Sequence, residues 1–177
     1  PSQSTGWAFF DTSLPFSAMT AGVLKSEGGR GVPLTEKAAS LGPKLVKLFN
    51  DHTRPDFVAI EDPPQKAYGK PVAVKQKFMG EEIEGDEEIE GNTSGLKGVI
   101  STNDCATALA TVIRCYGIPF VLLQDSTWRK NAYGFGKRTG WSRPDWKKHA
   151  RALCGQNKIV VTNDDSAEAC WIAFAGS

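Results

Sequence analysis

Long apolar runs, cysteine-based ligand motifs and a large net charge are all missing from this 177-residue sequence. No stretch approaches the roughly 18 apolar residues of a membrane span, and no charged segment leads into an apolar one at the start, so we expect neither a transmembrane helix nor a signal peptide. The 4 cysteines show no CxxC or Cys/His spacing, which predicts reduced, mostly buried thiols in a cytoplasmic protein. A hydrophobic content of 40% excludes a disordered chain, and the length favours one globular domain over residues 1–177.

The net charge of +1 hides two segregated clusters. Residues 81–90 carry seven acids and no base, so the rest of the chain sums to +8. Residues 129–151 carry eight bases against one acid, Asp145. An ordinary solvated helix intersperses both signs, whereas a stripe of this density is typical of a surface that binds a polyanion. The sequence therefore favours contact with nucleic acid.

Carboxylates open the last helix that the sequence predicts, for which Asn163 or Asp164 is the expected N-cap. Asp165 and Glu168 are three residues apart and emerge one turn apart on the same helix face. Two carboxylates this close repel each other unless a proton or a cation lies between them, and a hard divalent ion suits oxygen ligands. The alternative is that these acids only favour the positive end of the helix dipole.

Hydrophobic periodicity predicts an α/β chain. Thr35 is a plausible cap for a helix that Gly42-Pro43 should kink or split, and Ser142 or Asp145 can start a basic helix. Glu61 ends a short apolar strand, where α/β proteins build sites, although strand ends also turn polar where they meet solvent. The expected strands are 6–11, 21–25, 57–61 and 119–123, with a short extended piece at 158–161, and the expected helices are 35–51, 96–116, one starting near Trp128, 142–153 and the last one.

Residues 62–95 lack periodicity and are rich in glycine, proline and charge, which predicts a long mobile loop. Its first half mixes lysines with Tyr68 and Phe78, a combination suited to stacking on unpaired bases while neutralising phosphates. Its acidic second half would repel DNA and is equally typical of simple disorder.

Four short motifs follow one another in an order that a known family shares. They are Pro1-Ser2-Gln3-Ser4-Thr5-Gly6-Trp7-Ala8, Val58-Ala59-Ile60-Glu61, Ser126-Thr127-Trp128-Arg129-Lys130 with the later Gly134-Phe135-Gly136 and Asp145-Trp146-Lys147-Lys148, and Asp165-Ser166-Ala167-Glu168-Ala169. Together they resemble the RuvC-type Holliday-junction resolvases, particularly their phage-like relatives. The matching family segments are the turn after the first strand, the second acidic strand end, the basic segment with its Gly-x-Gly bend, and a closing Asp-x-Ala-Asp-Ala helix. Glu168 stands in place of the second Asp of that helix.

The resemblance implies a ribonuclease H-like fold, a mixed sheet flanked by helices, and an endonuclease that cuts four-way DNA junctions as a homodimer. It also implies that the protein acts in the cytoplasm of a bacterial or phage-infected cell. The family's first catalytic aspartate would directly precede Pro1, at the end of a central strand, and neither is in this sequence. We therefore expect the fold without its first strand, and an enzyme that is inactive in this form if that aspartate is essential.

The resemblance also implies the site residues. Glu61, Asp165 and Glu168 would be catalytic and would hold one or two Mg²⁺ ions, with Mn²⁺ as an alternative. Arg129 or Lys130, whichever faces the site, would neutralise charge on the reacting phosphate, and Lys130 is taken as the catalytic cation. The helix near Cys105 is one candidate dimer interface. The expected DNA-binding residues are Arg129, Lys130, Lys137, Arg138, Lys147, Lys148, Arg151, Tyr68 and Phe78.

Two alternatives remain open from the sequence. A nuclease of the same fold acting on RNA or on flaps would share the carboxylates. A non-catalytic domain of this fold would bind nucleic acid without cutting it.

Overall fold

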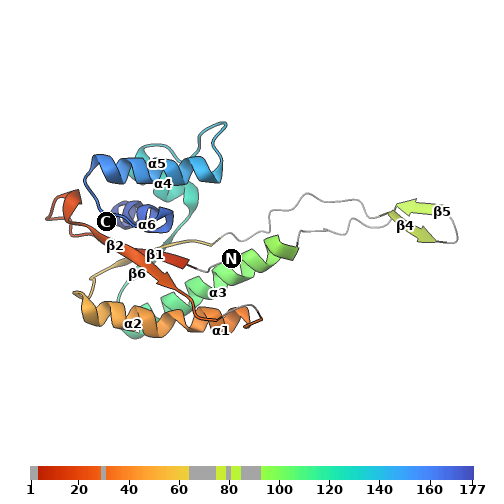
Figure 1. The fold of residues 1–177 in the computed structure, drawn as a ribbon, viewed down its shortest axis with the longest axis horizontal. Coiled ribbons are helices and arrows are strands. Elements are labelled where there is room, and N and C mark those ends of the chain that lie inside the picture. Colours follow the sequence, from red (N-terminus) through yellow and green to blue (C-terminus); the bar gives the residue numbers. More distant parts are fainter. Residues whose placement is uncertain (1–3, 29–30, 64–74, 79–80, 85–92) are drawn as a thin grey trace.

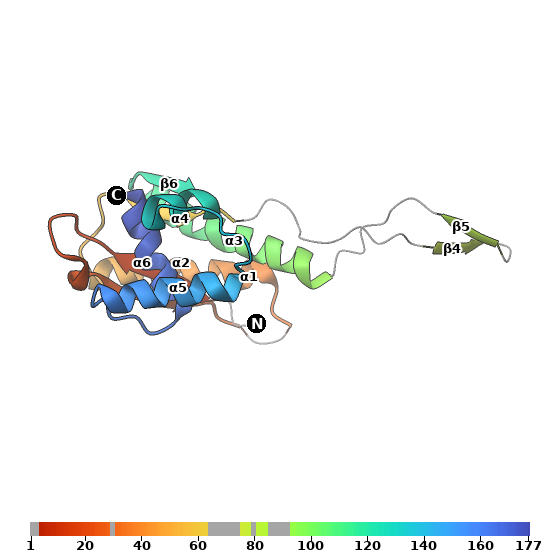
Figure 2. The same cartoon turned by 90° about the horizontal axis from the view of Figure 1, so that it is seen from above.

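The computed structural model describes residues 4–28, 31–63, 75–78, 81–84 and 93–177. Apart from β4 and β5, its strands lie between two groups of helices, with α1, α2 and α3 on one side and α4, α5 and α6 on the other (Figures 1 and 2). The helices of the first group are α1 (Leu34–Ala39), α2 (Leu41–Asp51) and α3 (Thr93–Cys115). Those of the second group are α4 (Asp125–Tyr133), α5 (Arg143–Gln156) and α6 (Asp164–Gly176). A short 3-10 helix spans Phe16–Ala18.

The described strands pair two by two. β1 (Ser4–Phe9) and β2 (Thr20–Lys25) are antiparallel, with Ser4 opposite Lys25. β3 (Val58–Glu61) and β6 (Phe120–Leu123) are parallel, with Glu61 opposite Leu123. The predicted α/β architecture, with both strand orientations and flanking helices, is thus confirmed, whereas residues 158–161 form no strand.

Local sequence explains most helix ends, with three corrections. Residues 34–51 form two helices as predicted, but the break falls at Ser40, because Pro43 is tolerated in a first turn where no intrahelical donor is needed. The N-cap of α1 is Pro33 rather than the predicted Thr35. α4 begins at Asp125, three residues before the predicted Trp128, and ends at Gly134, whose left-handed backbone has φ 82°.

The helices α5 and α6 both begin with reciprocal caps. Ser142 caps α5, and the Asp145 carboxylate accepts hydrogen bonds from the Ser142 backbone and hydroxyl. Asn163 caps α6 by accepting from the Ser166 N–H over 2.9 Å. This cap starts α6 at Asp164, and the three-residue spacing of Asp165 and Glu168 puts both on one face of the helix.

Two short strands and a helix start lie inside the predicted loop at 62–95. β4 (Lys75–Phe78) and β5 (Glu81–Glu84) pair antiparallel, with Lys75 opposite Glu84 and Lys77 opposite Glu82. Within the described residues, the two lysines of β4 therefore lie opposite two glutamates of β5. The prediction of mobility concerns mostly residues outside the described ranges.

Two apolar clusters form the core. The α6 cluster lies beneath the candidate site and includes fully buried Trp128, Cys154 and Cys170. The α3 cluster packs α2 and α3 against the strands through residues such as Leu41 and Ile113. All four cysteines are free. Cys154 and Cys170 are buried as predicted, whereas Cys115 is exposed. None of the helices in the described part of the chain combines the length and apolar character needed to cross a membrane.

Glycines allow both ends of α6 to approach the strands closely. A Cβ added at Gly6 in β1 would lie 2.0 Å from the Asp165 carbonyl oxygen. A Cβ at Gly176 would lie 2.5 Å from the Ala59 Cβ in β3. Because neither gap admits a methyl group without a shift, α6 is held directly against β1 at one end and β3 at the other.

Candidate active site

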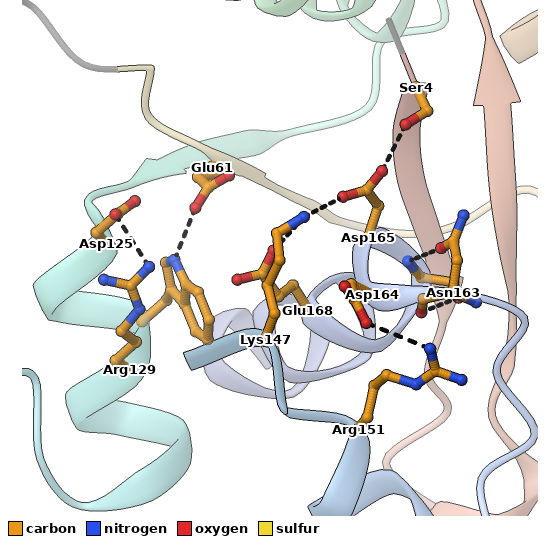
Figure 3. Close-up of polar contacts among 12 residues, drawn as sticks. Ser4, Glu61, Asp125, Arg129, Lys147, Arg151, Asn163, Asp164, Asp165 and Glu168 are labelled. Atoms are coloured by element: carbon orange, nitrogen blue, oxygen red, sulfur yellow. Dashed lines mark hydrogen bonds and ion pairs between the residues drawn. The ribbon is translucent and has the colours of Figure 1, made fainter. Parts of the chain in front are cut away.

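Four carboxylates from three segments gather where β3, α4 and α6 meet (Figure 3). Glu61 comes from the end of β3, Asp125 from the start of α4, and Asp165 and Glu168 from the first turns of α6. The charges of Asp125 and Glu168 both act on Glu61, and that of Asp165 acts on Glu168. The structure therefore brings together the three predicted acids and adds a fourth.

Asp165 has a polar partner for each of its oxygens. The Lys147 ammonium of α5 donates to Oδ1 over 2.8 Å, and the Ser4 hydroxyl of β1 donates to Oδ2 over 2.5 Å. Burial raises the pKa of the Asp165 carboxyl, but the hydrogen bonds from Lys147 and Ser4 outweigh it and leave the pKa below its usual range. Asp165 is thus held as a carboxylate.

Glu168 is more weakly paired. Its Oε2 lies 3.9 Å from the same Lys147 nitrogen, and its side chain is only 15% exposed. Burial raises its pKa above the ordinary value, against the opposing charges of Lys147, Arg129 and Arg143. Lys147 therefore lies between the two carboxylates of α6 and serves both.

Among the described residues Glu61 forms no ion pair, and it shares its surroundings with other acids. Trp128 Nε1 donates to Glu61 Oε1 over 3.2 Å. Although the residue as a whole is exposed, its carboxyl group lies among protein atoms. Burial, a hydrogen bond with Asp125 and the charges of Asp125 and Glu168 raise the Glu61 pKa to about 8, against the hydrogen bond from Trp128. Glu61 thus favours a proton when no other cation is near.

Arg129 is the cation of α4 that lies beside this cluster. Its guanidinium is 3.0 Å from Asp125 and lies over the rings of Trp128 at 5.0 Å and Trp146 at 4.8 Å. Its side chain is 13% exposed, and its buried Nε has no hydrogen-bond partner in the described part of the chain. These contacts with two tryptophan rings and with Asp125 hold the Arg129 guanidinium in position.

Lys130 is exposed, and no contact with the carboxylates is found for it among the described residues. Arg129, by contrast, lowers the pKa of Glu168 through its charge. Between the two residues that the sequence left open, the geometry therefore favours Arg129 as the cation facing the site.

A basic groove of about 480 Å³ runs beside α5, next to the carboxylates. Lys148 is exposed at this groove, and Arg151 lies 3.4 Å from Asp164. Lys147 lines the groove as well, but its ammonium turns toward Asp165. The groove-lining residues are Arg143, Pro144, Lys147, Lys148, Arg151 and Asp164.

The remaining predicted DNA contacts lie elsewhere. Lys137 and Arg138 are exposed in the turn after α4, and the Arg138 guanidinium lies 4.5 Å from the centre of the Trp141 ring. Tyr68 lies outside the described residues. Phe78 is the last residue of β4, and its side chain also lies outside what the structure describes.

The predicted ligands do not form a metal-binding group as they stand. In the described part of the chain, no three Asp, Glu, His or Cys side chains lie close enough together to hold an ion. Their chemistry nevertheless fits a hard divalent cation, because all the donors are carboxylates and because burial and acidic neighbours raise the pKa of Glu61. The donor set fits the ion, and a lysine lies among the donors.

Sequence reasoning did not single out Asp125 as a site residue. A usable signal existed, since Asp125 closely follows β6 and β6 is the parallel neighbour of β3, so acids at both strand ends reach the same edge. Ser4 carried no such signal, because its contact with Asp165 joins residues 161 apart in the sequence. Arg143 was counted in the basic stripe but not singled out, and it acts on both Asp165 and Glu168.

Comparison with known proteins identifies the fold. No protein-family model matches the chain, and neither does any curated protein. A structure of Thermus thermophilus RuvC matches 89% of this chain and 78% of its own, with a TM-score of 0.50 and 16% sequence identity. At that identity the likeness is one of fold alone. The chain has a mixed α/β, ribonuclease H-like fold similar to that of RuvC, as the sequence motifs predicted.

Proposed function

We propose that this protein is a metal-dependent endonuclease that cuts branched DNA, with the four-way junction as its substrate. The observation that carries the proposal is the meeting of Glu61, Asp165 and Glu168 from separate segments beside a basic groove. The fold shared with a RuvC structure supports this reading. We include in the same proposal that the protein belongs to the phage-like branch and acts in a bacterial or phage-infected cell.

Each group of residues has a role in this chemistry. Glu61, Asp165 and Glu168 would hold Mg²⁺ or Mn²⁺, with Asp125 as a fourth acid beside them. A bound divalent ion supplies Lewis-acid activation of water and stabilises the leaving oxygen. Arg129, packed against Trp128 and Trp146, would place its positive charge near a phosphate oxygen on which negative charge develops.

The basic groove supports binding without base recognition. Lys148 and Arg143 offer charge to the phosphate backbone, which positions DNA but carries no sequence information. Arg151 is already paired with Asp164, so its contribution to phosphate binding is expected to be smaller than that of Lys148. Asp164, the first residue of α6, also lines the groove, so the groove reaches the residue that precedes Asp165.

A homodimer suits a substrate with two equivalent strands to cut. The predicted interface helix is part of α3, whose Leu109 and Ile113 are buried in the α3 cluster. Its other face borders a hollow of about 720 Å³ with Ala106, Ala110 and exposed Leu122. We assign the second copy to this face, because the inner face is already covered within one chain.

The testing experiment compares strand-labelled substrates: a four-way junction, duplex DNA, a flap and a structured RNA, each with Mg²⁺, Mn²⁺ or EDTA. The proposed function requires metal-dependent cleavage that is fastest on the junction, and a dimer requires symmetric cuts in opposite strands. Preferred cleavage of RNA or flaps would contradict the substrate assignment.

A non-catalytic alternative has its own supporting observation, because Lys147 neutralises Asp165 where a metal ligand is required. Tight junction binding without cleavage under any metal condition would favour this alternative.

A further inference from the structure

Lys147 is the one described cation in ion-pair contact with both carboxylates of α6. Its nitrogen lies 2.8 Å from Asp165 and 3.9 Å from Glu168, and its side chain is 21% exposed. Figure 3 draws it between the two acids, reaching over from α5. The Asp165 oxygen that Lys147 does not contact is occupied by Ser4, so both oxygens of this acid are engaged within the chain.

The neighbouring base on α5 behaves differently. Lys148 is exposed at the groove, with no ion pair to Asp165 or Glu168 among the described contacts. The two adjacent residues carry the same side chain but point about 100° apart around the helix. A substitution at Lys148 therefore changes the net charge by the same amount as one at Lys147. Comparing the two isolates the effect of the position of the charge.

An ammonium in this position does electrostatically what a bound metal ion would do. Asp165 and Glu168 are each less than a third exposed, so their mutual repulsion is poorly screened. Lys147 offsets that repulsion in the metal-free protein. A divalent ion approaching the same oxygens meets a positive charge and must break the Lys147 hydrogen bond to Asp165.

We propose that Lys147 is a built-in counter-cation of the acidic site, and that a divalent ion binds Asp165 only by displacing it. This inference rests on the proposed function, since it takes the carboxylates as metal ligands. The lysine lowers metal affinity while keeping the site folded without metal. When displaced, the ammonium is released next to the basic groove, where a DNA phosphate can receive it.

The test measures Mn²⁺ binding calorimetrically, without DNA, in the wild type, Lys147→Met, Lys147→Arg and Lys148→Met. Methionine keeps the length and apolar stem of lysine and removes only the charged end. Lys147→Met is expected to tighten Mn²⁺ binding about tenfold, the effect of one charge at a partly exposed site. Lys148→Met and Lys147→Arg should stay within about threefold of the wild type, since the first removes only a distant charge and the second keeps a cation in place.

Thermal unfolding provides a second readout that does not depend on activity. Without metal, Lys147→Met should melt at a lower temperature than Lys148→Met, because Asp165 and Glu168 lose their shared cation. Saturating Mn²⁺ should raise the melting temperature of Lys147→Met more than that of the wild type.

Two results would overturn the inference: equal Mn²⁺ affinity in Lys147→Met and Lys148→Met, or weaker binding in Lys147→Met than in the wild type. Absence of Mn²⁺ binding in every variant would overturn it as well. The proposed function is judged separately, by cleavage of the substrate panel by the wild type. Cleavage with unchanged metal affinity would therefore reject the lysine's role and leave the nuclease intact.

Discussion

The two sides of the acidic site contain the same functional group in opposite electrostatic settings. On the α6 side, Asp165 faces Lys147 and Ser4, and its pKa is lowered. On the β3 side, Glu61 faces Asp125 and Glu168, and its pKa rises to about 8. The comparison shows that the position of an acid in a sequence motif does not determine its charge. One side of the site keeps its negative charge with a lysine, whereas the other keeps a proton until a cation arrives.

The largest expected effect comes from neutralising either side. Glu61→Gln and Asp165→Asn should each reduce metal-dependent cleavage by roughly a thousandfold or more, because each removes a metal ligand. Junction binding should persist or strengthen, since repulsion toward phosphate falls. Single-turnover cleavage and a binding titration measure the two effects.

Asp164→Asn is the matched control for these substitutions. Asp164 precedes Asp165 but pairs with Arg151 instead of Lys147. Its cleavage should stay within about tenfold of the wild type, because only an exposed ion pair is lost. If Glu61→Gln retained cleavage, the β3 side would not belong to the active site. The contrast between the two sides would then have no functional meaning.

A smaller effect is expected at Arg129, which joins the two sides through Asp125 and Glu168. Arg129→Ala should slow cleavage about a hundredfold by removing a positioned donor. Lys130→Ala, on the exposed neighbour, should change the rate less than about threefold. The measurement is the cleavage rate at saturating junction, and equal losses in both variants would mean that neither residue faces the reacting phosphate.

The smallest expected effect is the pH dependence of stability, which runs in opposite directions on the two sides. The Glu61 pKa rises on folding from an ordinary 4.5 to about 8, so its contribution is complete below pH 4.5 and is lost as pH rises toward 8. The Asp165 pKa falls on folding, so its contribution is present above its ordinary 3.8 and is lost as pH falls through the lowered pKa.

Urea unfolding without metal at several pH values checks this prediction. Relative to the wild type, Glu61→Gln should lose the decline in unfolding free energy between pH 5 and about 8. Asp165→Asn should leave that decline in place and reduce the loss at acid pH. A decline that survives in Glu61→Gln would show that another group causes it.

The sequence predicted the features that depend on local chemistry. The Asn163 cap and the spacing of Asp165 and Glu168 lie within one helix turn, so their common face follows from helix geometry alone. Glu61 could be placed because an apolar run ending in an acid indicates the edge of a parallel pair. Gly42-Pro43 likewise indicated a break between α1 and α2, which the structure places at Ser40.

The partners of these acids could not be predicted in the same way. Whether Arg129 or Lys130 faces the site depends on how buried Trp128 orients α4, which is a tertiary effect. The Lys147 contact with Asp165 requires α5 to pack across α6, and two adjacent lysines look alike in sequence. The electrostatic contrast between the two sides of the site therefore emerges only in three dimensions.

The close contacts of Gly6 and Gly176 have a mechanical consequence. Because α6 touches β1 at its start and β3 at its end, it has no slack along its axis. A methyl group added at Gly6 or Gly176 would push α6 away from the strand at that end. The helix would tilt, and Asp165 and Glu168 would move relative to Glu61. Two residues without side chains thus set the tolerance to which the acids are aligned.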